Sequence, residues 1–361
     1  MKVGIARHIY ISVACCLIAA VPASEACTTA IVSAGASSTG KPMLWKQRDA
    51  MNPFNTVVTI AGTDSTFAYT GLFNVGDLGR RSAYAGQNEK GFAIVNNVSY
   101  NLAVKQYPPE NGSLMRRALE RCATVDEFET LVMAENPRLC EANFAVVDAT
   151  GAAAYFEAAD SSVTRFDVPE GGWLVRANYS VTGKDGKVLP GSKMFRSGMA
   201  RYETAYELMA SHKGKFSPEF FIDGLGRSWY NAALGYDASK RHRNGRVYDE
   251  DFIPRTTTVS SVCFDGNGTM WTAVGYTPAS YAMPLEVCGE MPSCLAEANA
   301  LADSLKYAMH PLPRDGAVKY IDFKTVRRVM KIVRRYEKEA ALLKGDNDAL
   351  DRLFTRFKQE F

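Results

Sequence analysis

Cys27 is the residue of this sequence with the clearest capacity for chemistry. It follows the small-residue triplet Ser24-Glu25-Ala26, and an apolar stretch with a basic start at Lys2 and Arg7 lies upstream. This pattern is typical of a secretory signal and its cleavage site. Cleavage after Ala26 would give the mature chain an N-terminal cysteine, which carries a thiol nucleophile and a free α-amine on one residue. Such an amine has a pKa near ~8 and can act as a general base close to neutral pH.

Three other interpretations of Cys27 stay open from the sequence. The residue could form a disulfide bond, it could carry a lipid anchor, or cleavage could fall one or two residues away. A lipoprotein signal usually has Leu three residues before its cysteine, and this chain has Ser24 there. A surface lipoprotein or binding protein anchored at Cys27 is therefore an alternative to an enzyme.

Asp49 is expected to return to the neighbourhood of Cys27. Residues 28–33 are β-prone, residues 35–42 have the composition of a turn, and residues 43–46 are typical of a return strand. A hairpin of this kind places the residues after its second strand beside the residues before its first strand. The sequence thus predicts a carboxylate close to the thiol.

The order of the remaining elements favours antiparallel sheets covered by segregated helices. Thr124 is expected to cap a helix over residues 125–134, and the run Asp265-Gly266-Asn267-Gly268 predicts a tight turn between two strands. Further strands are expected at 56–60, 66–69, 91–95, 143–148, 152–157, 173–177, 256–264 and 270–275, and further helices at 113–122, 196–209 and 218–224. Strands and helices do not alternate around a glycine-rich phosphate loop, which argues against a Rossmann-type fold.

Composition and charge exclude several classes of protein. The formal net charge of the 361 residues is +3, which does not suggest a nucleic-acid partner. After the signal, no apolar run approaches the ~18 residues that span a bilayer. No cysteine spacing resembles a zinc site. Cys122 with Cys140 and Cys288 with Cys294 are the cysteine pairs nearest in sequence, but spacing alone establishes neither bridge.

The C-terminal region is predicted to form a basic amphipathic helical hairpin. Apolar residues recur at helical spacing from Val326 to Leu343 with Lys and Arg between them, a break follows at residues 345–348, and a second apolar series runs from Leu350 to Phe361. We expect this hairpin to pack on the main domain. Its basic face makes peripheral membrane contact an alternative.

These patches together resemble one family. The stretches Cys27-Thr28-Thr29 and Leu44-Trp45-Lys46-Gln47-Arg48-Asp49 are similar to the opening of the cysteine N-terminal-nucleophile (Ntn) hydrolases. That superfamily includes the choloylglycine hydrolase and penicillin V acylase group and, closer to this chain, the acyl-CoA:6-aminopenicillanic acid acyltransferase group (peptidase family C45). The similarity continues over residues 91–97, 143–157, 173–180 and 256–275.

The resemblance implies an α+β fold, the four-layer αββα sandwich, here with a C-terminal helical extension. The implied organisation is a signal peptide at 1–26, a catalytic domain at 27–316 and the helical hairpin at 317–361. It also implies roles for five residues. Cys27 would be the nucleophile, Asp49 would orient it, Asn178 and Asn97 would donate hydrogen bonds to the oxyanion, and Arg201 would be the helix arginine near the site.

Some matches to the family pattern are ambiguous. Asn96 competes with Asn97, and Arg196 competes with Arg201. Choloylglycine hydrolases have Arg three residues before the Asp, whereas this chain has Lys46 there and Arg48 next to the Asp. Strand alternation predicts that Arg48 points away from the site. The Lys46 departure argues against a strict bile-salt hydrolase, because lysine lacks the bidentate fork of arginine.

The sequence therefore predicts an exported, periplasmic or extracellular amidohydrolase that acts on a small-molecule linear amide through a thioester, with no metal or organic cofactor. An acyltransferase of the same family is the close alternative, since it differs only in which nucleophile reaches the thioester. Homotetramers occur among relatives, so a homo-oligomer is one alternative, and the sequence leaves the oligomeric state open.

Overall fold

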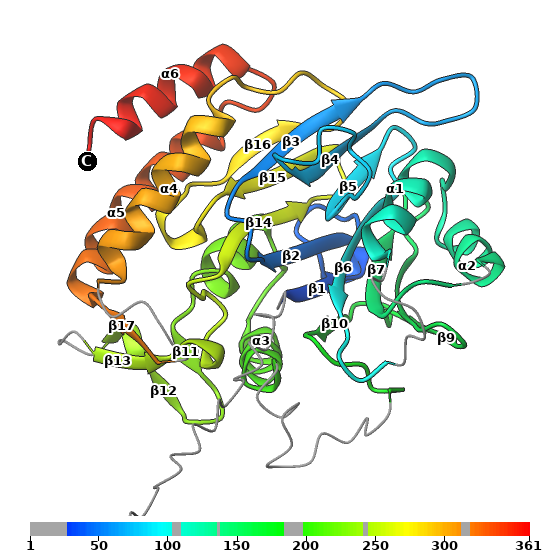
Figure 1. Cartoon of the computed structure of the whole chain (residues 1–361), viewed down its shortest axis with the longest axis horizontal. Coiled ribbons are helices and arrows are strands. Elements are labelled where there is room, and N and C mark those ends of the chain that lie inside the picture. Colours follow the sequence, from blue (N-terminus) through cyan, green and yellow to red (C-terminus); the bar gives the residue numbers. More distant parts are fainter. Residues whose placement is uncertain (1–26, 103–109, 136–137, 184–197, 241–244, 312–317) are drawn as a thin grey trace, which may run out of the picture.

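A computed structural model of the chain describes residues 27–102, 110–135, 138–183, 198–240, 245–311 and 318–361. Two antiparallel sheets form its centre and face each other (Figure 1). The predicted signal segment at 1–26 and the competing Arg196 lie outside the described residues.

The six-stranded sheet carries the N-terminal end of the described chain on an interior strand, next to an edge strand. Its strands, in order across the sheet, are β10 (Trp173–Arg176), β1 (Thr28–Val32), β2 (Met43–Asp49), β14 (Thr258–Phe264), β15 (Thr269–Val274) and β16 (Met283–Glu286). The predicted hairpin of β1 and β2 is confirmed, with Thr28 opposite Gln47. The predicted turn at residues 265–268 joins β14 to β15.

The seven-stranded sheet follows the chain order without a crossover. Its strands are β3 (Asn55–Ile60), β4 (Tyr69–Asn74), β5 (Ala85–Asn88), β6 (Ala93–Val98), β7 (Ala142–Val147), β8 (Ala153–Ala158) and β9 (Val163–Asp167). The prediction of a strand at 66–69 is wrong, because strand β4 begins only at Tyr69. Thr63 and Thr66 exchange backbone hydrogen bonds and close a turn at this point instead.

Strand alternation divides the apolar residues among three layers. Ile31 and Leu44 lie in the core between the sheets, whereas Ala30 and Trp45 face outward into a second cluster. That outer cluster is covered by α3 (Met199–Ser211) and by one π-helical segment, η3 (Phe220–Leu225).

The outer face of the seven-stranded sheet is covered by α1 (Asn111–Arg121) and α2 (Val125–Ala134) (Figure 1). Thr124 caps α2 as predicted, because its side chain accepts from the backbone of Glu127 and the Glu127 carboxylate accepts from the backbone of Thr124. Helices thus lie outside both sheets, and the predicted four-layer αββα sandwich is confirmed.

Three further helices pack together at one end of the sandwich (Figure 1). They are α4 (Leu295–Met309), α5 (Phe323–Ala340) and α6 (Asn347–Lys358). The apolar stripe of α5 from Val326 to Ala340 is buried in the same core that lies between the sheets. On the basic side of α5, Arg334 pairs with Asp223 and Arg335 with Glu360. Peripheral membrane contact through this side stays a prediction.

The remaining elements are short. Two small sheets pair β11 (Tyr230–Asn231) with β12 (Tyr236–Asp237) and β13 (Gly245–Tyr248) with β17 (Val318–Ile321). The 3-10 turns are η1 (Ala34–Ala36), η4 (Ala238–Lys240), η5 (Asp249–Asp251) and η6 (Thr277–Ala279).

Candidate active site

Cys27 directly precedes β1, an interior strand of the six-stranded sheet, and is 4% exposed. Strands β10 and β2 flank β1 as antiparallel partners. The chain leaves β2 at Asp49 and leaves β10 just before Asn178, so both residues lie at the same end of the sheet as Cys27. The topology therefore gathers three of the predicted site residues at one place.

Arg201 connects this end of the sheet to helix α3. Its fully buried guanidinium donates hydrogen bonds to the carbonyl oxygen of Cys27 at 2.8 Å and to Thr28 Oγ1 at 2.9 Å. The other terminal nitrogen donates to Asn178 Oδ1 at 2.8 Å. One side chain thus fixes the backbone of the predicted nucleophile relative to the predicted oxyanion donor.

Gly198 allows α3 to begin close to these residues. It precedes the helix with a φ of +98°, a backbone conformation that favours glycine. A Cβ at this position would lie 2.9 Å from Arg201 Nη2 and 3.1 Å from the backbone nitrogen of Asn178. The absence of a side chain at residue 198 is therefore part of how the site is assembled.

The two predicted oxyanion donors lie close together and are fully buried. Asn178 Nδ2 donates to the carbonyl oxygen of Val98 at 2.9 Å. Asn97, on β6, donates to the carbonyl oxygen of Ala177 and accepts from Thr29 Oγ1 at 3.3 Å. Asn97 therefore holds the peptide that precedes Asn178 against β1, which links the two sheets at the site.

Asp49 is buried at the end of β2 with positive charge around it. Thr258 Oγ1 donates to its Oδ1 at 2.6 Å, and Arg255 Nη1 lies 3.6 Å from its Oδ2. Burial raises the pKa of Asp49 to about 6, although Arg255, Arg201 and the Thr258 hydrogen bond all lower it. The carboxyl group is therefore set to titrate close to neutral pH.

Arg255 is a site residue that the sequence analysis missed. It is 4% exposed, and its guanidinium also pairs with Asp249, at 3.9 Å, and with Glu250. Burial acts to lower the pKa of Arg255, but the carboxylates of Asp49, Glu250 and Asp249 outweigh it and raise the pKa. The sequence offered one signal, the position of Arg255 directly before a predicted strand. The structure shows that this strand pairs with β2, so that Thr258 lies opposite Asp49.

Lys46 and Arg48 bond asparagine side chains of the seven-stranded sheet. Lys46 Nζ donates to Asn96 Oδ1 at 2.8 Å and to the carbonyl oxygen of Tyr84 at 2.9 Å. Arg48 donates to Asn74 Oδ1 at 3.0 Å, and its guanidinium carbon lies 3.7 Å from the centre of the Tyr84 ring. Asn96 thus binds Lys46, whereas Asn97 contacts β1 and the residue before Asn178.

Five cysteines in the described part of the chain form no disulfide bond: Cys122, Cys140, Cys263, Cys288 and Cys294. Neither pair that is close in sequence is therefore bridged. Across the described ranges, no cluster of three His, Cys, Asp or Glu side chains is arranged to hold a metal ion. Among the helices of the same ranges, none combines the length and the apolar character that a membrane span requires.

Several solved structures are similar to this chain at low identity. A Caenorhabditis elegans N-acylethanolamine-hydrolyzing acid amidase ortholog is 14% identical over 66% of this chain and 92% of its own, with a TM-score of 0.44. A variant of conjugated bile acid hydrolase from Clostridium perfringens is 12% identical over 68% and 89%, with a TM-score of 0.42. Penicillin V acylase from Agrobacterium tumefaciens is 13% identical over 72% and 86%, with a TM-score of 0.39.

No curated protein matches the chain. A family model does match, that of acyl-coenzyme A:6-aminopenicillanic acid acyl-transferase, over residues 43–231. The match covers more than half of the 361 residues and includes Asp49, Asn97, Asn178 and Arg201. The chain therefore belongs to the acyl-coenzyme A:6-aminopenicillanic acid acyl-transferase family.

Proposed function

We propose that this protein is an exported amidase that cleaves a linear, non-peptide amide of a small molecule through a thioester on Cys27. Removal of residues 1–26 would expose the α-amine of Cys27 as the general base, in the periplasm or outside the cell. The observation that carries the proposal is the set of bonds made by Arg201. They join the backbone of Cys27 to the side chain of Asn178 in a buried site.

The proposed reaction has two steps. The Cys27 sulfur forms a bond to the amide carbonyl carbon, its proton passes to the α-amine, and the C–N bond then breaks as the α-ammonium protonates the leaving amine. Water next adds to the thioester, which releases the carboxylic acid and restores the thiol. Asn178 would donate to the oxyanion of each tetrahedral intermediate, an interaction worth about 3 kcal/mol at comparable sites.

Asp49 would hold the N-terminal ammonium. Its Oδ2 is buried and has no hydrogen-bond partner among the described residues. A buried, unsatisfied carboxylate oxygen is costly, and a donor that appears after cleavage would remove this cost. The pairing would also favour the ionised form of Asp49.

Acyl transfer is the second candidate, favoured by the description of the family that matches residues 43–231. It uses the same thioester, but a second amine takes the acyl group in place of water. Product analysis with and without an added amine acceptor separates the two reactions. Hydrolysis predicts only the free acid in both conditions, whereas transfer predicts a new amide when the acceptor is present.

N-terminal sequencing and intact mass of the secreted protein, before and after a thiol-acylating probe, test the mechanism. We expect a chain that starts at an unmodified Cys27 and takes up one probe equivalent there, while Cys27→Ala takes up none at that position. Because Cys263 is fully buried, Cys263→Ala is a matched control that should leave labelling of Cys27 unchanged. A chain that starts elsewhere, or a diacylglyceryl adduct on Cys27, would contradict the proposal and favour a surface lipoprotein.

A further inference from the structure

Helix α5 carries a row of cations on the side that faces away from the protein core. Its 18 residues include seven Lys or Arg and two Glu, whereas the formal net charge of the whole chain is only +3. Five of these cations follow one another at alternating intervals of four and three residues, which places them on one face of a helix. We call this row the basic stripe, and its members are Lys324, Arg328, Lys331, Arg335 and Lys338.

The basic stripe is exposed along its whole length. The buried residues of α5, from Val326 to Ala340, lie on the opposite face of the helix. Figure 1 shows α5 at the margin of the molecule, beside α4 and α6. At the rise of an α-helix, the row from Lys324 to Lys338 is about 21 Å long. A row of this length can contact an extended surface at several points.

Most of the charge in the basic stripe has no counterion within the protein. Arg335 pairs with Glu360. Arg328, Lys331 and Lys338 form no salt bridge with any described residue. Cations three and four positions apart on a helix are neighbours and repel each other. The row therefore favours binding of an anionic partner.

The two glutamates of α5 do not balance the basic stripe. Glu337 faces inward, where it accepts from Arg227 Nη2 at 2.6 Å and from the backbone nitrogen of Ala282 at 2.7 Å. Glu339 pairs with Arg356 of α6 at 2.6 Å. Both carboxylates thus belong to the contacts that hold α5 in place.

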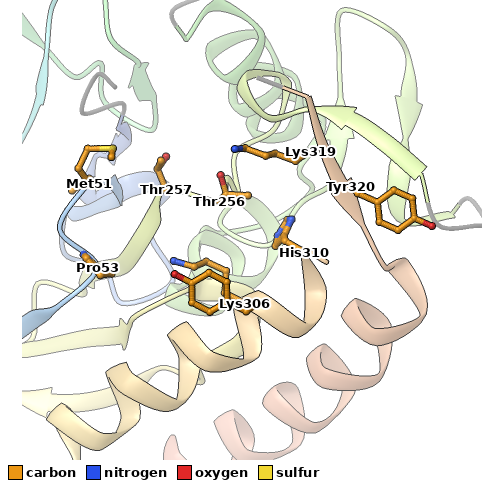
Figure 2. A pocket seen from close by; sticks show the side chains of 10 residues that line it. Met51, Pro53, Thr256, Thr257, Lys306, His310, Lys319 and Tyr320 are labelled. Carbon is orange, nitrogen blue, oxygen red and sulfur yellow. The ribbon is translucent and has the colours of Figure 1, made fainter. Parts of the chain in front are cut away.

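The cavities beside α5 do not account for the exposed charge. One of about 310 Å³ includes Lys338 in its wall, but a second cation and three carboxylates also line it. Another, of about 380 Å³, lies beside β17, the strand that leads into α5 (Figure 2). There Lys306 pairs with Asp303 at 2.5 Å, and Lys319 also interacts with another group. An extended anionic surface therefore matches the basic stripe better than a small anion in a pocket does.

An exposed leucine continues the basic stripe at the same spacing. Leu342 follows Lys338 by four residues and is 85% exposed. A charged row that ends in an apolar side chain matches a bilayer, whose apolar interior begins below its charged headgroups. A soluble polyphosphate has no such apolar layer. A second copy of this chain would place like charges opposite each other at this face, which is unfavourable.

We propose that the basic stripe and Leu342 bind the protein to the surface of a bilayer that contains anionic phospholipids. The cations would contact the phosphate groups, and Leu342 would enter the boundary between headgroups and acyl chains. Most of the attraction would come from charge, so the association is peripheral, reversible and weakened by salt. This surface contains no residue of the candidate active site, and the inference does not rest on the proposed amidase activity.

Sedimentation with lipid vesicles tests this inference. The chain used starts at Cys27, because the apolar segment within residues 1–26 could itself bind lipid. We expect binding to vesicles made of equal parts of phosphatidylcholine and phosphatidylglycerol, weak binding to pure phosphatidylcholine, and loss of most binding at about 1 M salt. The combined substitution Arg328→Gln, Lys331→Gln and Lys338→Gln should lower the partition coefficient by about fivefold for each residue, and by about a hundredfold in total.

A matched variant removes the same charge from other exposed positions. The combined substitution Lys41→Gln, Arg121→Gln and Lys213→Gln should bind the mixed vesicles almost as tightly as the parent does. Leu342→Ser should weaken binding severalfold and leave its salt dependence unchanged, because this variant loses apolar contact and no charge. Thiol labelling of Cys27 and the melting temperature should stay close to the parent values in every variant.

Several outcomes would overturn the inference. Equal losses in the two triple variants would show that net charge alone, and not the basic stripe, sets the affinity. Equally tight binding to pure phosphatidylcholine would show that anionic headgroups are not recognised. If soluble polyphosphate binds through the basic stripe but vesicles do not, the partner is a soluble polyanion. Failure of the thioester mechanism would be seen separately, because Cys27→Ala should still bind vesicles like the parent.

Discussion

Arg255 Nη1 lies 3.6 Å from Asp49 Oδ2 inside the protein, too far for a hydrogen bond, and neither atom has a hydrogen-bond partner among the described residues. The charge of Arg255 therefore offsets only part of the rise in the pKa of Asp49 that burial causes. Burial still dominates and raises the pKa of Asp49 to about 6. Because Asp49 titrates in this range, we expect both the free energy of unfolding and kcat/KM to depend on pH.

The first prediction concerns stability between pH 4 and pH 6. The folded-state pKa of Asp49 lies above the ordinary aspartate value of ~3.9, so in this range the folded chain binds more protons at Asp49 than the unfolded chain does. The contribution of Asp49 to the free energy of unfolding should thus fall by about 3 kcal/mol as pH rises through this window. Denaturant unfolding of the uncleaved parent chain and of its Asp49→Asn variant at several pH values measures it, because the N-terminal ammonium of the cleaved chain would lower the pKa of Asp49. Asp64→Asn, at an exposed position, is the control, and a parent-minus-variant difference that stays constant with pH would contradict the assignment.

The second prediction concerns activity. If ionised Asp49 holds the N-terminal ammonium, that charge lowers the pKa of Asp49 from about 6, and kcat/KM should rise with pH through a limb below pH 6. Because Arg255 lowers the pKa of Asp49, Arg255→Gln should move this limb upward by about one to three pH units. Arg255→Lys keeps a positive charge and should move it less. An unchanged limb in Arg255→Gln would show that a different group controls the profile.

Much of the fold follows from local signals in the sequence. The β1–β2 hairpin, the Thr124 cap and the turn at 265–268 each depend on residues close in the chain, and each is confirmed. Helix α4 was not predicted, although its buried residues recur at three and four positions: Leu295, Ala298, Ala302, Leu305 and Met309. Alanine occurs both on the buried side of α4, at Ala298 and Ala302, and on its exposed side, at positions 296, 300 and 308. This weakens the contrast in hydrophobicity between the two faces, which is the usual signal of a helix.

The candidate site could be predicted from the sequence only in part, because some of its contacts join residues far apart in the chain. Cys27 and Asp49 come from one hairpin, so their proximity follows from local pairing. The partnership of Asp49 with Arg255 depends on the pairing of β2 with β14, which are some 200 residues apart. No local periodicity records such a pairing. The arrangement around Arg201 likewise depends on how α3 docks on the sheet.

The third prediction separates oxyanion stabilisation from structural support by Asn178. Asn178→Asp retains an oxygen that can accept from Arg201 but removes the amide donor. We expect kcat to fall by about 10²- to 10³-fold in Asn178→Asp, as for the loss of one oxyanion donor. Thermal unfolding should show that Asn178→Asp is folded. Asn97→Ala is the comparison variant, because Asn97 braces the Ala177 peptide through a hydrogen bond. Parent-like kcat in a folded Asn178→Asp would exclude this role.

The fourth prediction uses two glycines that flank α3. Gly198 and Gly214 both have positive φ, +98° and +107°, so alanine at either position should cost about 1–3 kcal/mol of stability. Only at Gly198 would the added Cβ meet Arg201 Nη2, at 2.9 Å, whereas nothing lies within 4 Å at Gly214. Gly198→Ala should therefore lower kcat/KM as well as the melting temperature, because Arg201 must move away from Cys27 or Asn178. Gly214→Ala should lower only the melting temperature. If both variants lose stability equally and keep full activity, the position of Arg201 is not coupled to the reaction.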